Sequence, residues 1–186
     1  MAKIIAFSGS AREASYNQKL VTVAAGAARS GGADVTLISL ADLPMPLFSE
    51  DLERSEGMPE NARKFKTLLT ESDGFLIASP EYNSAFSPLL KNALDWASRA
   101  IPDQPMQTYG KKVAAIMSAS PGALGGMRGL VFVRMLLNNL GVMVIPEQVT
   151  VPLAHKAFAE DGSIIDGKKH QTIINLSDNL IKHCAK

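Results

Sequence analysis

Short, uninterrupted apolar runs constrain the fold of this chain more than any other feature. Three of these runs contain only apolar residues: 4–7, 75–78 and 113–117. A strand without alternation of polar and apolar side chains is typical of a parallel sheet that helices cover on both faces. Residues 142–145 predict a further strand, whose continuation Pro146 limits. Val35 and Leu37 alternate more weakly and predict a strand nearer the edge.

Between these runs, apolar residues recur at the three- and four-residue spacing of a helix face. Five stretches show this spacing: 20–28, 62–69, 89–97, 130–140 and 173–181. Ser87 and Pro88 precede the third stretch as its expected N-cap and first helical residue. The alternation predicts an α/β fold, with a flavodoxin-like, doubly wound, five-stranded parallel sheet of order 2-1-3-4-5 and helices on both faces.

Length and charge exclude several classes of protein. The 186 residues predict one domain, 1–186, with surface loops at 41–58 and 151–167. Nineteen basic and eighteen acidic side chains leave a net charge of +1, so no strong field favours nucleic acid or an anionic membrane. One cysteine, and three histidines without metal-ligand spacing, predict no metal site. Without a predicted membrane span or signal peptide, we expect a cytoplasmic protein.

Three polar segments directly follow predicted strands. They are residues 8–17, 80–83 and 118–126. In a doubly wound sheet, ligands bind beyond the carboxyl ends of the strands, at the point where the strand order reverses. The convergence of three such segments at this edge predicts a ligand site there.

The first segment, 8–17, lies between a strand and the start of a helix. Helix-start amides and the hydroxyls of Ser10 and Ser15 suit a dianionic phosphate, and the Asn17 amide and Arg12 guanidinium add further donors. The segment has neither a Walker loop nor the dinucleotide glycine pattern. The alternative is an ordinary turn, in which Ser15 or Asn17 is the helix N-cap and Arg12 is solvated.

The other two segments suit contacts between a ligand and the protein backbone. Pro80-Glu81-Tyr82-Asn83 could hold such a ring through its backbone amides, beside the aromatic face of Tyr82. The alternative is a tight turn whose tyrosine packs against the fold. Small residues and glycines in 118–126 allow the backbone to approach a ligand closely, and the alternative there is a flexible turn before the next helix.

Taken together, these residues resemble the NAD(P)H-dependent FMN reductase family, which is flavodoxin-like and includes quinone, azo-dye and chromate reductases. The resemblance rests on Gly9-Ser10-x-Arg12-x-x-Ser15-x-Asn17, Pro80-Glu81-Tyr82-Asn83, Lys91-Asn92-Ala93-Leu94-Asp95-Trp96 and Gly125-Gly126. It runs from Lys3 to about Glu147 and implies bound FMN, with NADPH or NADH as co-substrate. The implied FMN contacts are Ser10, Arg12, Ser15, Tyr16, Asn17, Pro80, Glu81, Tyr82, Asn83, Ser118, Ala119 and Ser120. No catalytic side chain is implied, since the flavin carries the chemistry.

The resemblance implies an oxidoreductase that passes hydride from a nicotinamide nucleotide through FMN to a quinone, flavin or similar small-molecule acceptor. The alternative is a flavodoxin-type one-electron carrier without NAD(P)H oxidation, although such carriers are usually strongly acidic and have a Thr-rich phosphate loop. A third hypothesis is a flavin-binding regulator whose FMN cannot be reduced by NAD(P)H.

The family commonly forms dimers or tetramers, so the resemblance also implies a homodimer or homotetramer. Arg128 or Arg134 could then pair with Glu147 between subunits, or all three could be solvated. We expect the 91–96 block to be mainly structural, with Trp96 packed beside the site or at a subunit contact.

Overall fold

The computed structural model describes residues 1–101 and 108–184, and within them five strands form one parallel sheet. The strands are β1 (Lys3–Ser8), β2 (Asp34–Leu37), β3 (Gly74–Ala78), β4 (Val113–Ala119) and β5 (Met143–Val151). Their order is β2-β1-β3-β4-β5, and every neighbouring pair is parallel. The predicted flavodoxin-like topology is confirmed.

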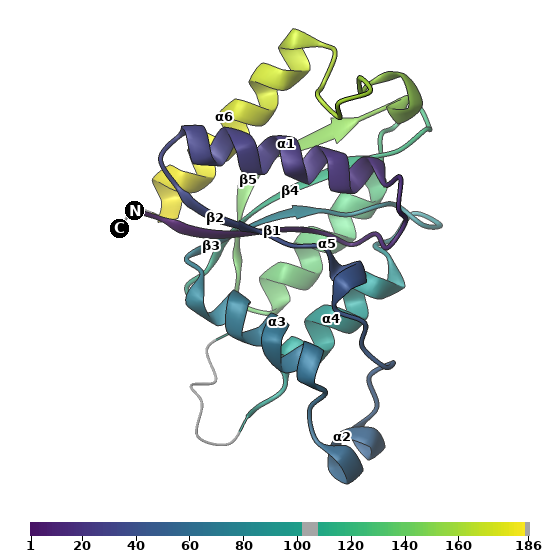
Figure 1. The fold of residues 1–186 in the computed structure, drawn as a ribbon, viewed down its shortest axis with the longest axis vertical. Coiled ribbons are helices and arrows are strands. Elements are labelled where there is room, and N and C mark those ends of the chain that lie inside the picture. The colour runs from purple at the N-terminus through teal and green to yellow at the C-terminus, as the bar shows by residue number, and fades with distance from the viewer. Residues whose placement is uncertain (102–107, 185–186) are drawn as a thin grey trace.

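Helices cover both faces of this sheet (Figure 1). They are α1 (Tyr16–Ser30), α2 (Glu50–Glu56), α3 (Glu60–Glu71), α4 (Pro88–Ser98), α5 (Met127–Asn139) and α6 (Gly167–Cys184). α1 and α6 pack on one face, and α3, α4 and α5 pack on the other. Ser87 caps α4 as predicted, because its hydroxyl accepts from the Leu90 amide. None of the helices in the described ranges is long and apolar enough to cross a membrane.

The helix α2 corrects the prediction that 41–58 is a loop. This short helix has no buried residue, so it shows no apolar periodicity from which it could be predicted. The signals that were present are local ones: Ser49 caps its start and Gly57, with φ +78°, follows its end. Single-turn 3₁₀ helices also occur at Leu40–Asp42 and, within the predicted loop 151–167, at Ala154–Lys156.

Strand β5 runs past Pro146, where the sequence predicted that its continuation would be limited. The register between β4 and β5 shifts at 114–116, opposite the proline. β5 is an edge strand, a position that tolerates the missing N–H of proline. The Arg134 guanidinium donates to the carbonyl oxygens of Val144, Ile145 and Pro146, at 3.1, 2.7 and 3.3 Å. Together, the irregular register and this guanidinium accommodate the proline.

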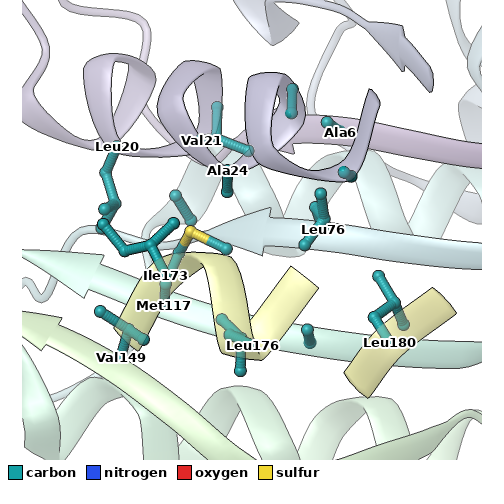
Figure 2. Packing of buried hydrophobic residues seen from close by; sticks show 14 of the residues in the cluster. Ala6, Leu20, Val21, Ala24, Leu76, Met117, Val149, Ile173, Leu176 and Leu180 are labelled. Atoms are coloured by element: carbon teal, nitrogen blue, oxygen red, sulfur yellow. The ribbon is translucent and has the colours of Figure 1, made fainter. Parts of the chain in front are cut away.

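Two apolar layers hold the helices to the sheet. Figure 2 shows the layer beneath α1 and α6, where Leu20, Met117 and Leu176 are among the buried side chains. Successive side chains of a strand point to opposite faces of the sheet, so neighbouring residues pack in different layers. For example, Leu76 lies in this layer and Ile77 in the other. Burial of the strands on both faces explains the uninterrupted apolar runs. It also holds β1, β3 and β4 in place, and with them the carboxyl ends from which the site loops start.

Candidate functional site

The loops that follow β1, β3 and β4 meet at the carboxyl edge of the sheet. They enclose a cavity of about 70 Å³, lined by Ser10, Arg12, Ser15, Tyr16, Asn17, Pro80, Glu81, Tyr82, Ala119, Ser120 and Pro121. Of the residues predicted from the sequence, only Asn83 and Ser118 do not line this cavity, whereas Pro121 was not predicted. The structure therefore brings together side chains from segments more than a hundred positions apart in sequence.

The volume of this cavity indicates what part of a ligand it can enclose. Pockets that enclose whole small molecules measure roughly 300–1,000 Å³, so this one has room for only one end of such a ligand. A cavity of about 650 Å³ lies at the opposite edge of the sheet, beside Lys112 and Cys184. Burial raises the pKa of the Cys184 thiol to about 11, which makes it a poor nucleophile. The donor chemistry therefore favours the smaller cavity as the functional site.

The side of the cavity formed by residues 10–17 is rich in hydrogen-bond donors. Ser10 and Ser15 are 5% and 3% exposed, and each hydroxyl accepts from a main-chain amide, of Arg12 and Gln18 respectively. A hydroxyl that accepts one bond keeps its own proton to donate. Ser15 is thus the N-cap of α1, as the alternative interpretation predicted, and it also lines the cavity, so its contact with a phosphate stays a prediction. Arg12 is exposed and forms no ion pair with any residue in 1–101 or 108–184.

Asn17 joins the first turn of α1 to the end of β4. Its Nδ2 donates to the Ala119 carbonyl at 2.9 Å, and its Oδ1 accepts from the Ala119 amide at 2.9 Å. Sequence reasoning considered Asn17 as a phosphate ligand or an N-cap and did not anticipate this pair. The second proton of Nδ2 is still available for a ligand, so the predicted contact with phosphate stays a prediction.

The loop after β3 forms a two-residue turn. The Tyr82 amide donates to the Ala85 carbonyl at 2.9 Å, and the Ala85 amide donates back to Tyr82 at 3.0 Å. Asn83 and Ser84, the two central residues, have φ of +51° and +68°, the conformation of a type I′ turn. The left-handed region is disfavoured for a serine, so the turn carries strain. Tyr82 is 46% exposed and leaves its ring at the mouth of the site rather than in the core.

Glu81 points away from this turn toward α5. Its Oε1 accepts from the Arg128 Nε at 3.0 Å, and its Oε2 accepts from the Gly129 amide at 2.9 Å. Burial opposes ionisation, but the bonds from Gly129 and Arg128 and the charge of Arg128 outweigh it, so the pKa of Glu81 is lowered. The Glu81 carboxylate is therefore ionised, and the positive charge of Arg128 balances it.

These contacts bear on the expected intersubunit ion pair. Arg128 already pairs with Glu81 of its own chain, and Arg134 donates to the main chain of β5. Glu147 accepts from Asn179 at 3.2 Å. All three side chains thus have partners within their own chain, and the expectation of a pair between subunits gains no support.

The third loop approaches α5 closely. Gly126 has φ +86°, and a Cβ atom placed on it would lie 1.9 Å from the Ser118 Oγ. Ser118 is fully buried, and its hydroxyl has no hydrogen-bond partner within the described residues. Its side chain faces Gly126 rather than the cavity, and its predicted contact with a ligand stays a prediction.

The 91–96 block is structural, as expected. Trp96 is fully buried, donates from Nε1 to the Pro46 carbonyl at 2.8 Å and packs edge-on against Phe48. Asn92 also donates to Pro46, and it accepts from the Phe48 amide at 2.8 Å. The block therefore fastens the segment before α2 to α4, and Trp96 does not line the cavity.

The comparisons with known proteins agree with this geometry. A family model described as NADPH-dependent FMN reductase matches residues 2–156. The chain belongs to this family. An NAD(P)H-dependent FMN reductase of Pseudomonas aeruginosa is 36% identical over 173 residues, which cover 92% of this chain and 89% of that protein. A quinone reductase of Escherichia coli is 33% identical over 166 residues, covering 88% and 85%.

A solved structure supports the same assignment. The flavoenzyme NAD(P)H:(acceptor) oxidoreductase FerB of Paracoccus denitrificans superposes with a TM-score of 0.81 at 26% identity, covering 99% of this chain and 97% of that one. The family makes the chain an oxidoreductase that depends on FMN and NAD(P)H, as the sequence motifs predicted.

The residues around the cavity fit FMN. Buried hydroxyls, helix-start amides and a guanidinium are the donor set that a phosphate dianion requires. Glu81 is the one carboxylate among the lining residues, and Arg128 and Gly129 occupy its oxygens. No uncompensated negative charge therefore faces the phosphate from the walls of the cavity.

Proposed function

We propose that this chain transfers hydride from NADPH or NADH to bound FMN and passes the electrons on to a quinone, flavin or similar small-molecule acceptor. The cavity carries the proposal, because it brings hydrogen-bond donors that suit a phosphate, from the segment after β1, together with the loops that follow β3 and β4. Bound FMN would supply the redox chemistry, taking hydride from the nicotinamide and giving electrons to the acceptor. The protein binds and orients the cofactor.

The proposed binding roles follow from position. Arg12 neutralises the phosphate, and the hydroxyls of Ser10 and Ser15 donate to it. Tyr16 and Asn17 complete this end of the cavity. The main chain of Pro80–Asn83 and of Ser118–Ser120 holds the ring, and Tyr82 shapes its open face. We assign no catalytic acid, base or nucleophile.

The nature of the acceptor rests on the relatives. The similar protein of Escherichia coli is named a quinone reductase, and two similar rice proteins are named probable NADPH:quinone oxidoreductases. A quinone is therefore the first acceptor to test. The small cavity and exposed Tyr82 are compatible with an open ring face that nicotinamide and acceptor use in turn.

We also propose that the chain works as a homodimer or homotetramer. Large apolar side chains are exposed on and just before α5: Leu124, Met127, Val131, Phe132 and Met135. Exposed apolar groups gathered on one element are typical of a protein–protein surface. Multi-angle light scattering is expected to give the mass of two or four chains, and a monomer mass would end the proposal.

The function is tested by visible absorption of the purified protein mixed with FMN. A shift of the flavin bands on mixing reports binding, and we then expect the bands to bleach under anaerobic addition of NADPH or NADH. Free FMN with the same nucleotide is the control. Bound flavin that neither nucleotide reduces would refute the reductase. Absence of any FMN binding would refute the cofactor site as well.

A further inference from the structure

A nearly buried carboxylate joins the β3 loop to helix α5. The Glu81 side chain is 9% exposed, and both of its oxygens are engaged, one by the Arg128 guanidinium and one by the Gly129 amide. Gly129 lies in the first turn of α5, where amides have no helical partner and the helix dipole favours an anion. Glu81 thus supplies an acceptor that the helix itself lacks.

The contact is also tight sterically. A Cβ atom placed on Gly129 would lie 3.2 Å from the Ala85 carbonyl oxygen and 3.2 Å from the Glu81 Cβ. These two residues flank the turn that Asn83 and Ser84 form, so α5 abuts both ends of it. The absent side chain at 129 is what allows this close approach.

The turn needs such a restraint. Two consecutive residues with positive φ, neither of them glycine, form its centre, and strained backbone of this kind persists only where the surroundings impose it. Apart from the Glu81 contacts, the turn is closed by its own two bonds between Tyr82 and Ala85. The side of the turn that carries Tyr82 is exposed.

We propose that Glu81 is a positioning residue for the flavin. Its bonds to Gly129 and Arg128 hold the strained turn, and with it the main-chain groups of Pro80–Asn83, in the arrangement that receives the ring. This inference rests on the proposed function, in which that loop contacts FMN. Arg128 is 60% exposed, so its ion pair contributes little by itself, and the partly buried bond to Gly129 carries most of the effect.

The first test uses the chain without FMN. Hydrogen exchange of the Tyr82 and Ala85 amides reports whether the turn is held, because both amides are bonded within it. We expect exchange to be about tenfold faster in Glu81→Ala, and less accelerated in Glu81→Gln, whose amide oxygen can still accept from Gly129. Glu60→Gln removes an exposed ion pair on α3 and is the matched control.

The second test measures FMN itself. We expect Glu81→Ala to weaken FMN binding about tenfold and Glu81→Gln to weaken it less, in the same order as the exchange rates. We also expect the midpoint potential of the bound flavin to change in Glu81→Ala and not in Glu60→Gln. Arg128→Ala keeps the Gly129 bond and should lie close to the wild type. If Glu81→Ala does not fold, the FMN affinity of Glu81→Gln relative to the wild type tests the proposal instead.

The outcomes separate this inference from the proposed function. If the wild-type chain binds no FMN, the proposed function fails and the positioning role toward the flavin fails with it, while faster exchange would still show a structural tie. If FMN binds and Glu81→Ala changes neither its affinity nor its potential, Glu81 does not position the flavin, whatever the exchange rates. Unchanged exchange of Tyr82 and Ala85 would overturn the proposed tie directly.

Discussion

The side-chain amide of Asn17 pairs with both main-chain groups of Ala119, a residue 102 positions further along the chain. The pair is buried and joins the first turn of α1 to the end of β4. Because the amide offers one donor and one acceptor to a peptide group, no other side chain except glutamine reproduces the pattern. Asn17 therefore fixes the distance between the two sides of the candidate site.

We expect Asn17→Asp to lower the free energy of unfolding by about 1–3 kcal/mol at neutral pH, because a carboxylate oxygen would then face the Ala119 carbonyl. FMN affinity should fall as well, since a charge is added beside the phosphate site. Urea unfolding of the FMN-free chain measures the first effect. Ala14→Asp, at an exposed position in the turn before α1, is the control for added charge. Equal stability of Asn17→Asp and wild type would show that the pair contributes nothing.

Replacing Arg12 should affect the ligand and not the fold. The side chain is exposed, and it has no ion-pair partner among residues 1–101 and 108–184, so Arg12→Ala should leave the unfolding free energy unchanged. FMN binding should weaken by about 1.5–3 kcal/mol, the usual range for a hydrogen bond to a charged group. Calorimetry at low and high salt checks both the loss and its electrostatic origin. An unchanged FMN affinity would remove Arg12 from the phosphate role.

Alanine substitutions at two glycines distinguish the cost of backbone strain from the cost of a steric clash. Gly126 and Gly141 both have positive φ. A Cβ on Gly126 would clash with the Ser118 hydroxyl, whereas no atom of the described residues lies within 4 Å of one on Gly141. Gly141→Ala should therefore cost about 1–2 kcal/mol, and Gly126→Ala distinctly more. Thermal unfolding measures both. The added substitution Ser118→Ala should recover part of the Gly126→Ala loss, and full additivity would contradict the clash.

The sequence was sufficient to predict the fold because strands that are buried on both faces leave continuous apolar runs. Each central run is continuous in sequence and buried on both faces in the structure, as 75–78 shows. The helix α2 and the continuation of β5 past Pro146 were missed for opposite reasons. α2 buries nothing and so leaves no periodic signal, whereas Pro146 is tolerated through a distant guanidinium that no local pattern reveals.

The site was predictable in its position and only partly in its contacts. That three loops meet at one edge follows from topology, and most predicted residues do line one cavity. The tie between Asn17 and Ala119 and the contact of Glu81 with Gly129 join residues far apart in sequence. Such pairs depend on how the folded elements are placed, so residue type and spacing alone did not predict them.

Lys66 gives a prediction for alkaline pH. It is 2% exposed, and its ammonium group donates to the Ala97 carbonyl at 3.0 Å and to the Thr108 hydroxyl at 2.6 Å. Burial lowers its pKa, so as pH rises the folded chain releases this proton before the unfolded chain does. Between the lowered value and the usual value of about 10.4, the unfolded state binds more protons, and the lysine's contribution to stability rises with pH.

Lys66→Met should therefore lose this part of the pH dependence. Urea unfolding at a series of pH values from 7 to about 10 is expected to show wild-type stability rising relative to Lys66→Met as the pH approaches the usual lysine pKa. Lys64→Met, on the exposed side of the same helix, is the control and should track the wild type apart from a constant offset. Parallel stability curves for wild type and Lys66→Met would mean that the buried lysine titrates alike in the folded and unfolded chain.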